Sequence, residues 1–227
     1  MSMVFAAKYD DRVELLTDGG VYDHEGVILK TTEKVWRSDA LALAFAGRGD
    51  HEAIKRMVSF LRILTIGKTF DEFAVTFAEM LAAKKGQFPD QVKIDGVIAG
   101  ISETSGPVIY YFHTDTTAGE EDPEPFTLLD AGLEAGDTSH VGPRDFFDAK
   151  LPMYWAIDGL SAYGVAFFEV LRSREMSHVA HPDKPKLFGI GGHVDHTVVT
   201  MSGATTKRLH TWPDKVGEKI DPTRSAA

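Results

Sequence analysis

The chain opens with Ser-Met-Val-Phe-Ala-Ala-Lys-Tyr-Asp-Asp at residues 2–11, a stretch that predicts the first half of a β-hairpin. Val4–Ala7 and Val13–Leu16 are apolar runs of strand length, and the polar Tyr9-Asp10-Asp11 between them is typical of a turn. Asp18-Gly19-Gly20 then breaks the strand pattern and begins a loop. The N-terminal part of the protein is therefore predicted to be β-structure, with further short strands before the first helix.

Two amphipathic helices are expected after these strands. Asp50 is a suitable N-cap, and apolar residues recur at helical spacing from there to Leu64, before Gly67 ends the helix. Thr69 and Glu72 have the spacing of a capping box, which predicts the start of a second helix. Two consecutive helices of this kind form a layer that covers one face of a sheet.

The rest of the chain repeats the pattern of strands followed by helices. A hairpin is expected from Gly96–Ile101 and Val108–Phe112, because the turn between them is polar and contains Gly and Pro. A short helix is expected at Arg144–Lys150 and a longer apolar helix at Met153–Arg174. Strands are expected again at Leu187–Ile190, Val194–Met201 and Thr206–Trp212.

Segregated blocks of strands and helices favour the α+β class over alternating β-α-β units. The arrangement that buries every amphipathic face is a four-layer αββα sandwich, in which two antiparallel sheets face each other and a helical pair covers each outer face. Residues 1–212 are expected to form this single domain, and residues 213–227 a polar, weakly structured C-terminal tail.

Composition excludes several classes of partner. The 227 residues include 24 Lys and Arg against 34 Asp and Glu, a net charge of −10. Such a chain lacks the basic surface that nucleic acids or anionic membranes require. The longest apolar stretch, Ala40–Ala46, is too short to cross a bilayer, and no signal peptide is recognised. With no Cys in the chain, there is neither a disulfide nor a Cys nucleophile. A cytoplasmic protein is expected.

The N-terminus carries the most suggestive chemistry. Removal of Met1 is expected because the second residue is small, and it would leave Ser2 with a hydroxyl and a free α-amine on one residue. The ordinary pKa of an α-amine is about 8, so this amine can take the hydroxyl proton without a His. A nucleophile of this kind also needs a nearby cation to keep the amine neutral, and N–H groups that hold an oxyanion.

The segment from Ser2 to Asp11, followed by Thr17-Asp18-Gly19, resembles the opening of the β-type subunits of proteasomes, which are N-terminal nucleophile hydrolases. In that family an Asp follows the nucleophile by sixteen residues and a Lys follows the Asp by sixteen more. Ser2, Asp18 and Lys34 fall on this spacing. The resemblance implies that Ser2 is the nucleophile, that Lys34 lowers the pKa of the α-amine of Ser2, and that Asp18 orients Lys34.

Two later segments extend the resemblance. Ala44-Phe45-Ala46-Gly47 is similar to the strand end whose glycine N–H forms the oxyanion hole of the family, which assigns that role to Gly47. Gly191-Gly192-His193-Val194 resembles the Gly-Gly-x-Val segment before the last strands. The implied protein is a peptidase or amidohydrolase that needs no cofactor or metal, acts on a peptide or small amide, and has the αββα sandwich fold.

A non-catalytic alternative belongs to a different functional class. The family has an Asp and a Ser around its Gly-Gly segment, whereas Leu187–Ile190 contain neither an acid nor a hydroxyl. The family's Gly-Ser-Gly before the third helix is also missing, and Thr138 or Ser139 could stand in for it. Without activity, the chain would be a proteasome-like subunit that serves as an oligomeric structural module.

Assembly is expected in either case. Phe60, Ile63 and Ile66 lie at or beyond the border of the main apolar stripe of the first helix, and exposed apolar strips commonly mark protein–protein contacts. A homo-oligomer is expected, a ring or stacked ring more than a simple dimer.

Two other sequence patterns resemble binding sites of a different kind. Four histidines lie within nineteen residues, but two of them flank a loop and the other two are three apart on an expected strand, so a metal site is not predicted. These are His178, His181, His193 and His196. The glycine-rich turn Gly47–Asp50 lacks the Gly-Lys-Ser/Thr ending of a phosphate loop.

Overall fold

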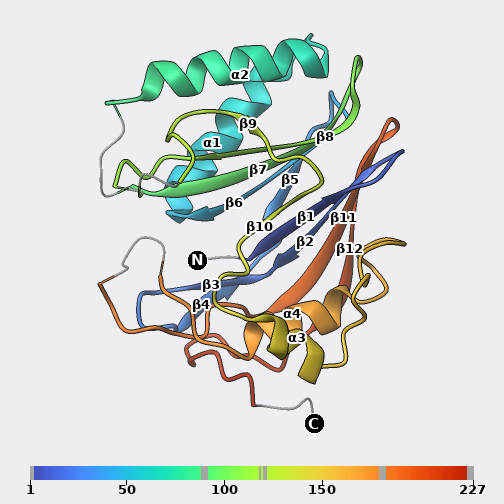
Figure 1. Cartoon of the computed structure of the whole chain (residues 1–227). Coiled ribbons are helices and arrows are strands. Elements are labelled where there is room, and N and C mark those ends of the chain that lie inside the picture. Colours follow the sequence, from blue (N-terminus) through green and yellow to red (C-terminus); the bar gives the residue numbers. More distant parts are fainter. Residues whose placement is uncertain (1–2, 88–91, 118, 120–121, 179–182, 224–227) are drawn as a thin grey trace.

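The computed structural model describes residues 3–87, 92–117, 119, 122–178 and 183–223. Two five-stranded antiparallel sheets face each other, and a two-stranded sheet lies beside them (Figure 1). The first sheet has the order β10-β1-β2-β11-β12 and consists of β10 (Glu134–Gly136), β1 (Val4–Lys8), β2 (Val13–Asp18), β11 (His193–Thr200) and β12 (Gly203–Thr211). The N-terminal strand therefore lies inside this sheet, between β10 and β2.

The second sheet has the order β5-β6-β7-β8-β9. Its strands are β5 (Val35–Arg37), β6 (Leu43–Gly49), β7 (Ile94–Ser102), β8 (Gly106–His113) and β9 (Leu129–Asp130). The two-stranded sheet consists of β3 (Gly20–Tyr22) and β4 (Ile28–Thr31). The two predicted hairpins, β1–β2 and β7–β8, are confirmed.

The space between the two large sheets is filled mainly by small apolar side chains. This cluster includes Val4, Ala6, Val13, Leu15, Ala44, Ala46, Val97, Ala99, Ala135 and Val199. Alanines from both sheets let the backbones approach closely, but such a layer leaves space wherever two of them face each other.

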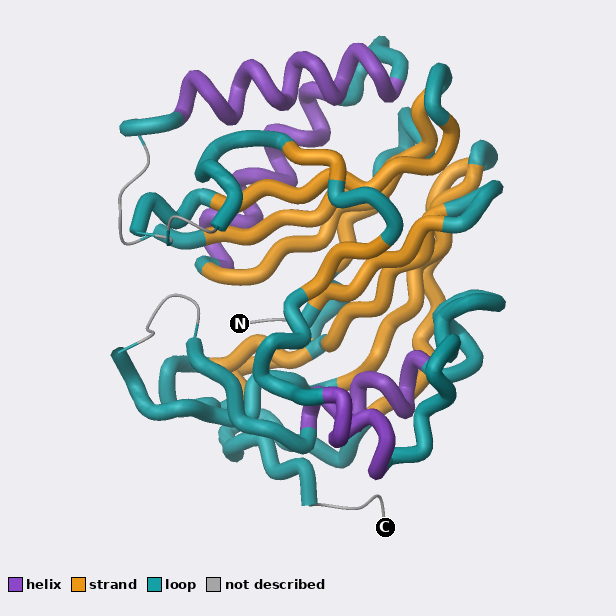
Figure 2. Tube along the Cα trace, in the orientation of Figure 1, coloured by secondary structure: helices purple, strands orange, loops and turns teal. Residues whose placement is uncertain are grey.

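The second sheet carries a complete helical layer on its outer face. Helices α1 (His51–Leu64) and α2 (Phe70–Lys84) lie side by side there (Figure 2). The predicted N-cap Asp50 accepts a hydrogen bond from the N–H of Ala53, and the capping box of Thr69 and Glu72 is present. The layer is held by a core rich in Phe, whose aromatic members are Phe45, Phe70, Phe73, Phe77 and Phe112.

The predicted four-layer αββα sandwich is wrong. Within the described residues the protein is mostly antiparallel β-structure, twelve strands in three sheets, and has four helices. The outer face of the first sheet carries only α3 (Pro143–Asp148) and α4 (Gly164–Arg172), of 6 and 9 residues, together with long connecting segments. A second helical layer is not formed.

The missing helical turns are those expected between residues 153 and 163. Gly159 has a φ of +118°, a conformation that interrupts a helix and that residues other than glycine rarely adopt. The N–H of Leu160 donates to the buried carboxylate of Glu14 (2.7 Å) instead of to a helical carbonyl. The apolar composition of this segment reflects burial of Leu160 and Trp155 against the first sheet, which does not require a helix.

The segment after β12 packs against the domain as far as residue 223. The N–H of Ile28 donates to the carbonyl of Glu218 (2.9 Å), and Ile220 is buried in the core of the first sheet's outer face. This part of the expected tail is thus attached to the start of β4. No helix in the described part of the chain has the length and apolarity needed to cross a membrane.

Candidate functional site

Asp18 is the centre of the candidate site. It ends β2, is 1% exposed, and accepts four hydrogen bonds from separate parts of the chain. Its Oδ1 accepts from the N–H of Met3 and from the ammonium of Lys34, both at 2.8 Å. Its Oδ2 accepts from the N–H groups of Gly20 (3.1 Å) and Gly191 (3.3 Å). A buried carboxylate needs such donors, and here they join four segments at one point.

Lys34 lies just before β5, and its side chain is 7% exposed. Its ammonium donates to Asp18 and to the carbonyl of Gly20. Burial lowers the pKa of Lys34 below its usual value, and the neighbouring Asp18 partly offsets this effect. The structure therefore brings the predicted Asp18 and Lys34 together as a buried ion pair.

The predicted nucleophile, Ser2, lies outside the described residues. The adjacent residue, Met3, is fully buried, and its N–H is held by Asp18. The chain is therefore fixed at the same carboxylate that binds Lys34, one residue after Ser2.

Gly47 lies on β6, across from Lys34. Val35 pairs with Ala46 in the β5–β6 register, so continuing that register by one residue sets Gly47 opposite Lys34. A Cβ at position 47 would lie 3.1 Å from the ring of Phe45 and 3.3 Å from Ile54, which leaves little room for a side chain. The predicted Gly47 and Lys34 thus share one location.

Both residues line a cleft of about 980 Å³. One wall is formed by the β3–β4 hairpin, and the other by the face of α1 that includes His51, Lys55 and Arg62. Volumes of this order are typical of small-molecule and peptide sites. The cleft provides an open approach to the buried pair from outside.

The Gly191-Gly192 segment packs against the end of β2 and the start of the β2–β3 connection. The N–H of Gly19 donates to the carbonyl of Gly191 (3.1 Å), and the ring of His193 packs so closely on Gly19 that a Cβ there would lie 2.1 Å from it. Gly192 has a φ of +80°, where a glycine is favoured. This segment contributes no carboxylate or hydroxyl to the site, but the N–H of Gly191 donates a hydrogen bond to Asp18.

A buried ion pair that the sequence analysis missed holds this segment. Arg172, at the end of α4, forms two hydrogen bonds with Asp214, at 2.6 and 2.9 Å, and both side chains are at most 2% exposed. Asp214 also accepts from the N–H of Gly192 (2.8 Å), and Arg172 donates to the carbonyl of Ile190 (2.5 Å). An Arg beside the apolar Phe168 and Leu171 of a helix is a sequence signal for a buried pair, although its partner could not be predicted.

Thr138 and Ser139, the suggested substitutes for the family's serine, follow β10. The N–H of Ser139 donates to Asp137 (2.9 Å), whose other carboxylate oxygen binds Arg48 (2.9 Å). Neither hydroxyl contacts Asp18 or Lys34, so the structure does not bring them to the pair.

The described histidines do not form a metal site. His193 contacts Asp195 and Arg208, whereas His196 contacts Glu14, and His181 lies outside the described residues. Among the residues that the structure describes, no group of three His, Cys, Asp or Glu is placed to bind a metal.

Compared with known protein families and with characterised proteins, the sequence matches none of them.

Proposed function

We propose that this chain is an N-terminal nucleophile amidohydrolase, most simply a peptidase, in which Ser2 attacks the substrate after removal of Met1. The observation that carries the proposal is the joint binding of the Met3 N–H and the Lys34 ammonium by one buried carboxylate, Asp18. A catalytic role would account for a Lys and an Asp buried together beside the start of the first strand, in addition to the segments that Asp18 joins.

In the proposed reaction the Ser2 hydroxyl adds to the amide carbonyl carbon while the Ser2 α-amine takes its proton. The positive charge of Lys34 disfavours protonation of the α-amine in the free enzyme and stabilises the attacking oxygen. The N–H of Gly47 is the proposed donor to the oxyanion. The C–N bond then breaks, and the proton passes to the leaving amine.

The product of this first half is an ester of Ser2. Water, deprotonated by the same α-amine, adds to the ester carbonyl, and the C–O bond to Ser2 breaks to release the acid and regenerate the hydroxyl. Every step uses groups of this chain, and no cofactor is required. The proposed substrate is a peptide or small amide that enters through the cleft. We place the reaction in the cytoplasm, in line with the absence of Cys.

The proposal is tested on the purified full-length chain by intact mass and covalent labelling. We expect loss of the mass of Met1, labelling by a β-lactone on Ser2, and hydrolysis of a fluorogenic peptide amide. Ser2→Ala should abolish labelling, whereas Ser59→Ala, an exposed serine of the same cleft, should not. A chain that retains Met1 and stays unlabelled would instead favour the non-catalytic structural module.

We also propose that the chain forms a homo-oligomer, with a ring as the favoured form. Phe60, Ile63 and Ile66 at the C-terminal end of α1 are 47%, 69% and 72% exposed. Three large apolar side chains on one exposed surface support a protein contact there.

A further inference from the structure

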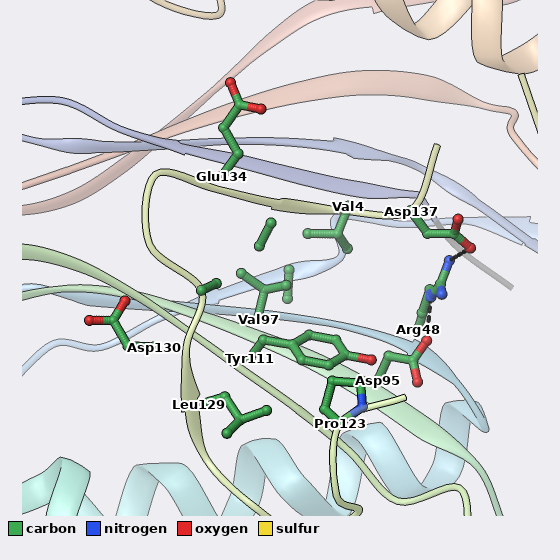
Figure 3. A pocket seen from close by; sticks show the side chains of 14 residues that line it. Val4, Arg48, Asp95, Val97, Tyr111, Pro123, Leu129, Asp130, Glu134 and Asp137 are labelled. Atoms are coloured by element: carbon green, nitrogen blue, oxygen red, sulfur yellow. Dashed lines mark hydrogen bonds and ion pairs between the residues drawn. The ribbon is translucent and has the colours of Figure 1, made fainter. Parts of the chain in front are cut away.

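A second cavity, of about 360 Å³, lies between the two large sheets where the chain passes from β9 to β10 (Figure 3). Its apolar wall comes from five strands and the connection between β9 and β10: Val4, Ala46, Val97, Leu129, Ala131 and Ala135. The cavity exists because alanines stand where larger side chains would close the layer between the sheets. Its volume suits a small molecule or one side chain of a ligand.

This cavity is distinct from the cleft of the candidate site. Successive residues of a strand point to opposite faces, so β6 has Gly47 and Gly49 in the cleft, and Ala46 and Arg48 in the second cavity. A ligand of the second cavity would therefore lie on the far side of β6 from the cleft.

One end of the cavity is polar and preorganised. Arg48 donates to Asp95 on β7 (2.5 Å) and to Asp137 after β10 (2.9 Å), and thereby joins the two sheets. Burial alone would raise the pKa of Asp137, but Arg48 and the hydrogen bond from Ser139 lower it to about 2. Both carboxylates are therefore paired with a fixed cation and held in place at this end of the cavity.

The phenol of Tyr111 supplies a further polar atom. Figure 3 shows its hydroxyl pointing toward Asp95 at the polar end. No described residue forms a hydrogen bond with this hydroxyl, although the Tyr111 side chain is partly buried. Burial raises the pKa of Tyr111, so the hydroxyl stays protonated and its oxygen can accept a hydrogen bond from a ligand.

The charge of the lining favours a cation. Four carboxylates line the cavity against the one guanidinium of Arg48: Asp95 and Asp137 lie with it at the polar end, and the exposed Asp130 and Glu134 lie at the opposite end (Figure 3). No Lys or His contributes to the lining, so acidic side chains outnumber basic ones by four to one. An anion would be repelled by these carboxylates, whereas a neutral apolar molecule would leave the Tyr111 hydroxyl without a hydrogen bond.

We propose that the intersheet cavity binds a small amphipathic cation, with its apolar group against Val4, Val97 and Leu129 and a primary ammonium at the end formed by Asp95, Asp137 and Tyr111. The ammonium provides three donors, which match the carboxylate oxygens and the phenol. The proposed amine site includes neither Ser2 nor Lys34, so its test is independent of the proposed hydrolase activity.

The test is calorimetric titration of the full-length chain with three probes that share a phenyl group: 2-phenylethylamine, 2-phenylethanol and phenylacetate. We expect the amine to bind at least tenfold more tightly than the alcohol, and phenylacetate not to bind. Raising the salt concentration should weaken the binding of the amine but not that of the alcohol. Equal affinities for amine and alcohol, or preference for phenylacetate, would overturn the assignment.

Variants locate the site. Ala135→Leu should fill the cavity and remove amine binding, whereas Ser59→Leu, in the other cleft, should leave it unchanged. If Ala135→Leu does not fold, Glu134→Lys decides the question, because Glu134 is an exposed rim residue of the cavity. Glu134→Lys should lower the affinity for the amine at least threefold. Glu79→Lys, at an exposed position on α2, should leave that affinity unchanged. Unchanged affinity in Glu134→Lys would place any amine binding elsewhere and refute the proposal.

Discussion

At the scale of single residues, Lys34 is a buried cation whose partner, Asp18, is a buried carboxylate. Replacing it by Met should destabilise the protein by about 3–5 kcal/mol, because Asp18 then remains buried without its cation. The same variant should lose β-lactone labelling of Ser2, because the proposed reaction depends on the positive charge. Urea unfolding and intact mass after labelling measure the two effects.

Two further variants separate charge from fold. Lys30→Met removes a lysine from the neighbouring strand and should cost less than about 0.5 kcal/mol, because Lys30 is exposed. The double variant Asp18→Asn with Lys34→Met removes both buried charges and should recover part of the stability without recovering labelling. Normal labelling of a folded Lys34→Met variant would contradict the proposed role of Lys34.

Glu14 gives a pH dependence with a definite sign. Burial alone would raise its pKa, but hydrogen bonds from His196, Arg12 and the N–H of Leu160 lower it from 4.5 to about 2. Because the folded state favours the ionised form, the stabilisation is present above about pH 4.5 and is lost as the pH falls toward 2. We expect the free energy of unfolding to drop by roughly 3 kcal/mol from this group over that interval.

The matched comparison is Glu14→Gln against Glu79→Gln, an exposed glutamate on α2. Urea unfolding at a series of pH values should show a flatter acid limb for Glu14→Gln and an unchanged limb for Glu79→Gln. An identical acid limb in both variants would mean that the Glu14 network does not control acid stability.

At the scale of elements, the connection between β2 and β3 depends on Gly19. A Cβ there would lie 2.1–2.3 Å from the ring of His193, which is itself fixed by Asp195 and Arg208 at 3.0 Å. Gly19→Ala should therefore destabilise the protein by about 1–3 kcal/mol, because β11 must shift. Thermal unfolding measures the effect, with Gly142→Ala, where the nearest atom is 3.9 Å away, as the control. Equal melting temperatures would contradict the close packing of β2 and β11.

The elements that could be predicted from sequence are those with a local cause. The helices α1 and α2 were predicted because each has an amphipathic repeat and a cap within its own sequence. A second cap on α2 could not be predicted: Glu103, from the turn between β7 and β8, accepts from the N–H groups of Phe70 (2.8 Å) and Asp71 (3.0 Å). Contacts of this kind depend on the tertiary fold.

The same distinction explains the errors. Apolar composition predicted a long helix at residues 153–174, because local patterns do not reveal that Leu160 binds Glu14 on a distant strand. The pairing of Asp18 with Lys34 was predictable only from a resemblance in spacing, since the two residues are sixteen positions apart. The Arg172–Asp214 pair had no such spacing to reveal it, although it positions the Gly191-Gly192 segment.

At the scale of the whole molecule, two exposed apolar surfaces favour contacts between copies of the chain. The exposed Phe60, Ile63 and Ile66 lie on the helical layer, and a second exposed apolar group surrounds α3 and the segment after it. That second group consists of Phe147, Met153, Tyr154 and Ile157, which are 80%, 86%, 72% and 68% exposed. Two separate apolar surfaces on opposite sides of the sheets allow each chain to contact more than one neighbour, as a ring or stacked ring requires.

We therefore expect light scattering at micromolar concentration to give a mass several times the 24.9 kDa of one chain. The double variant Ile63→Glu with Ile66→Glu should reduce that mass, because two buried carboxylates would oppose each contact on the helical layer. Lys55→Glu with Lys68→Glu is the control, since it changes charge nearby without removing an apolar side chain. A mass of one chain for the unchanged protein would refute the assembly.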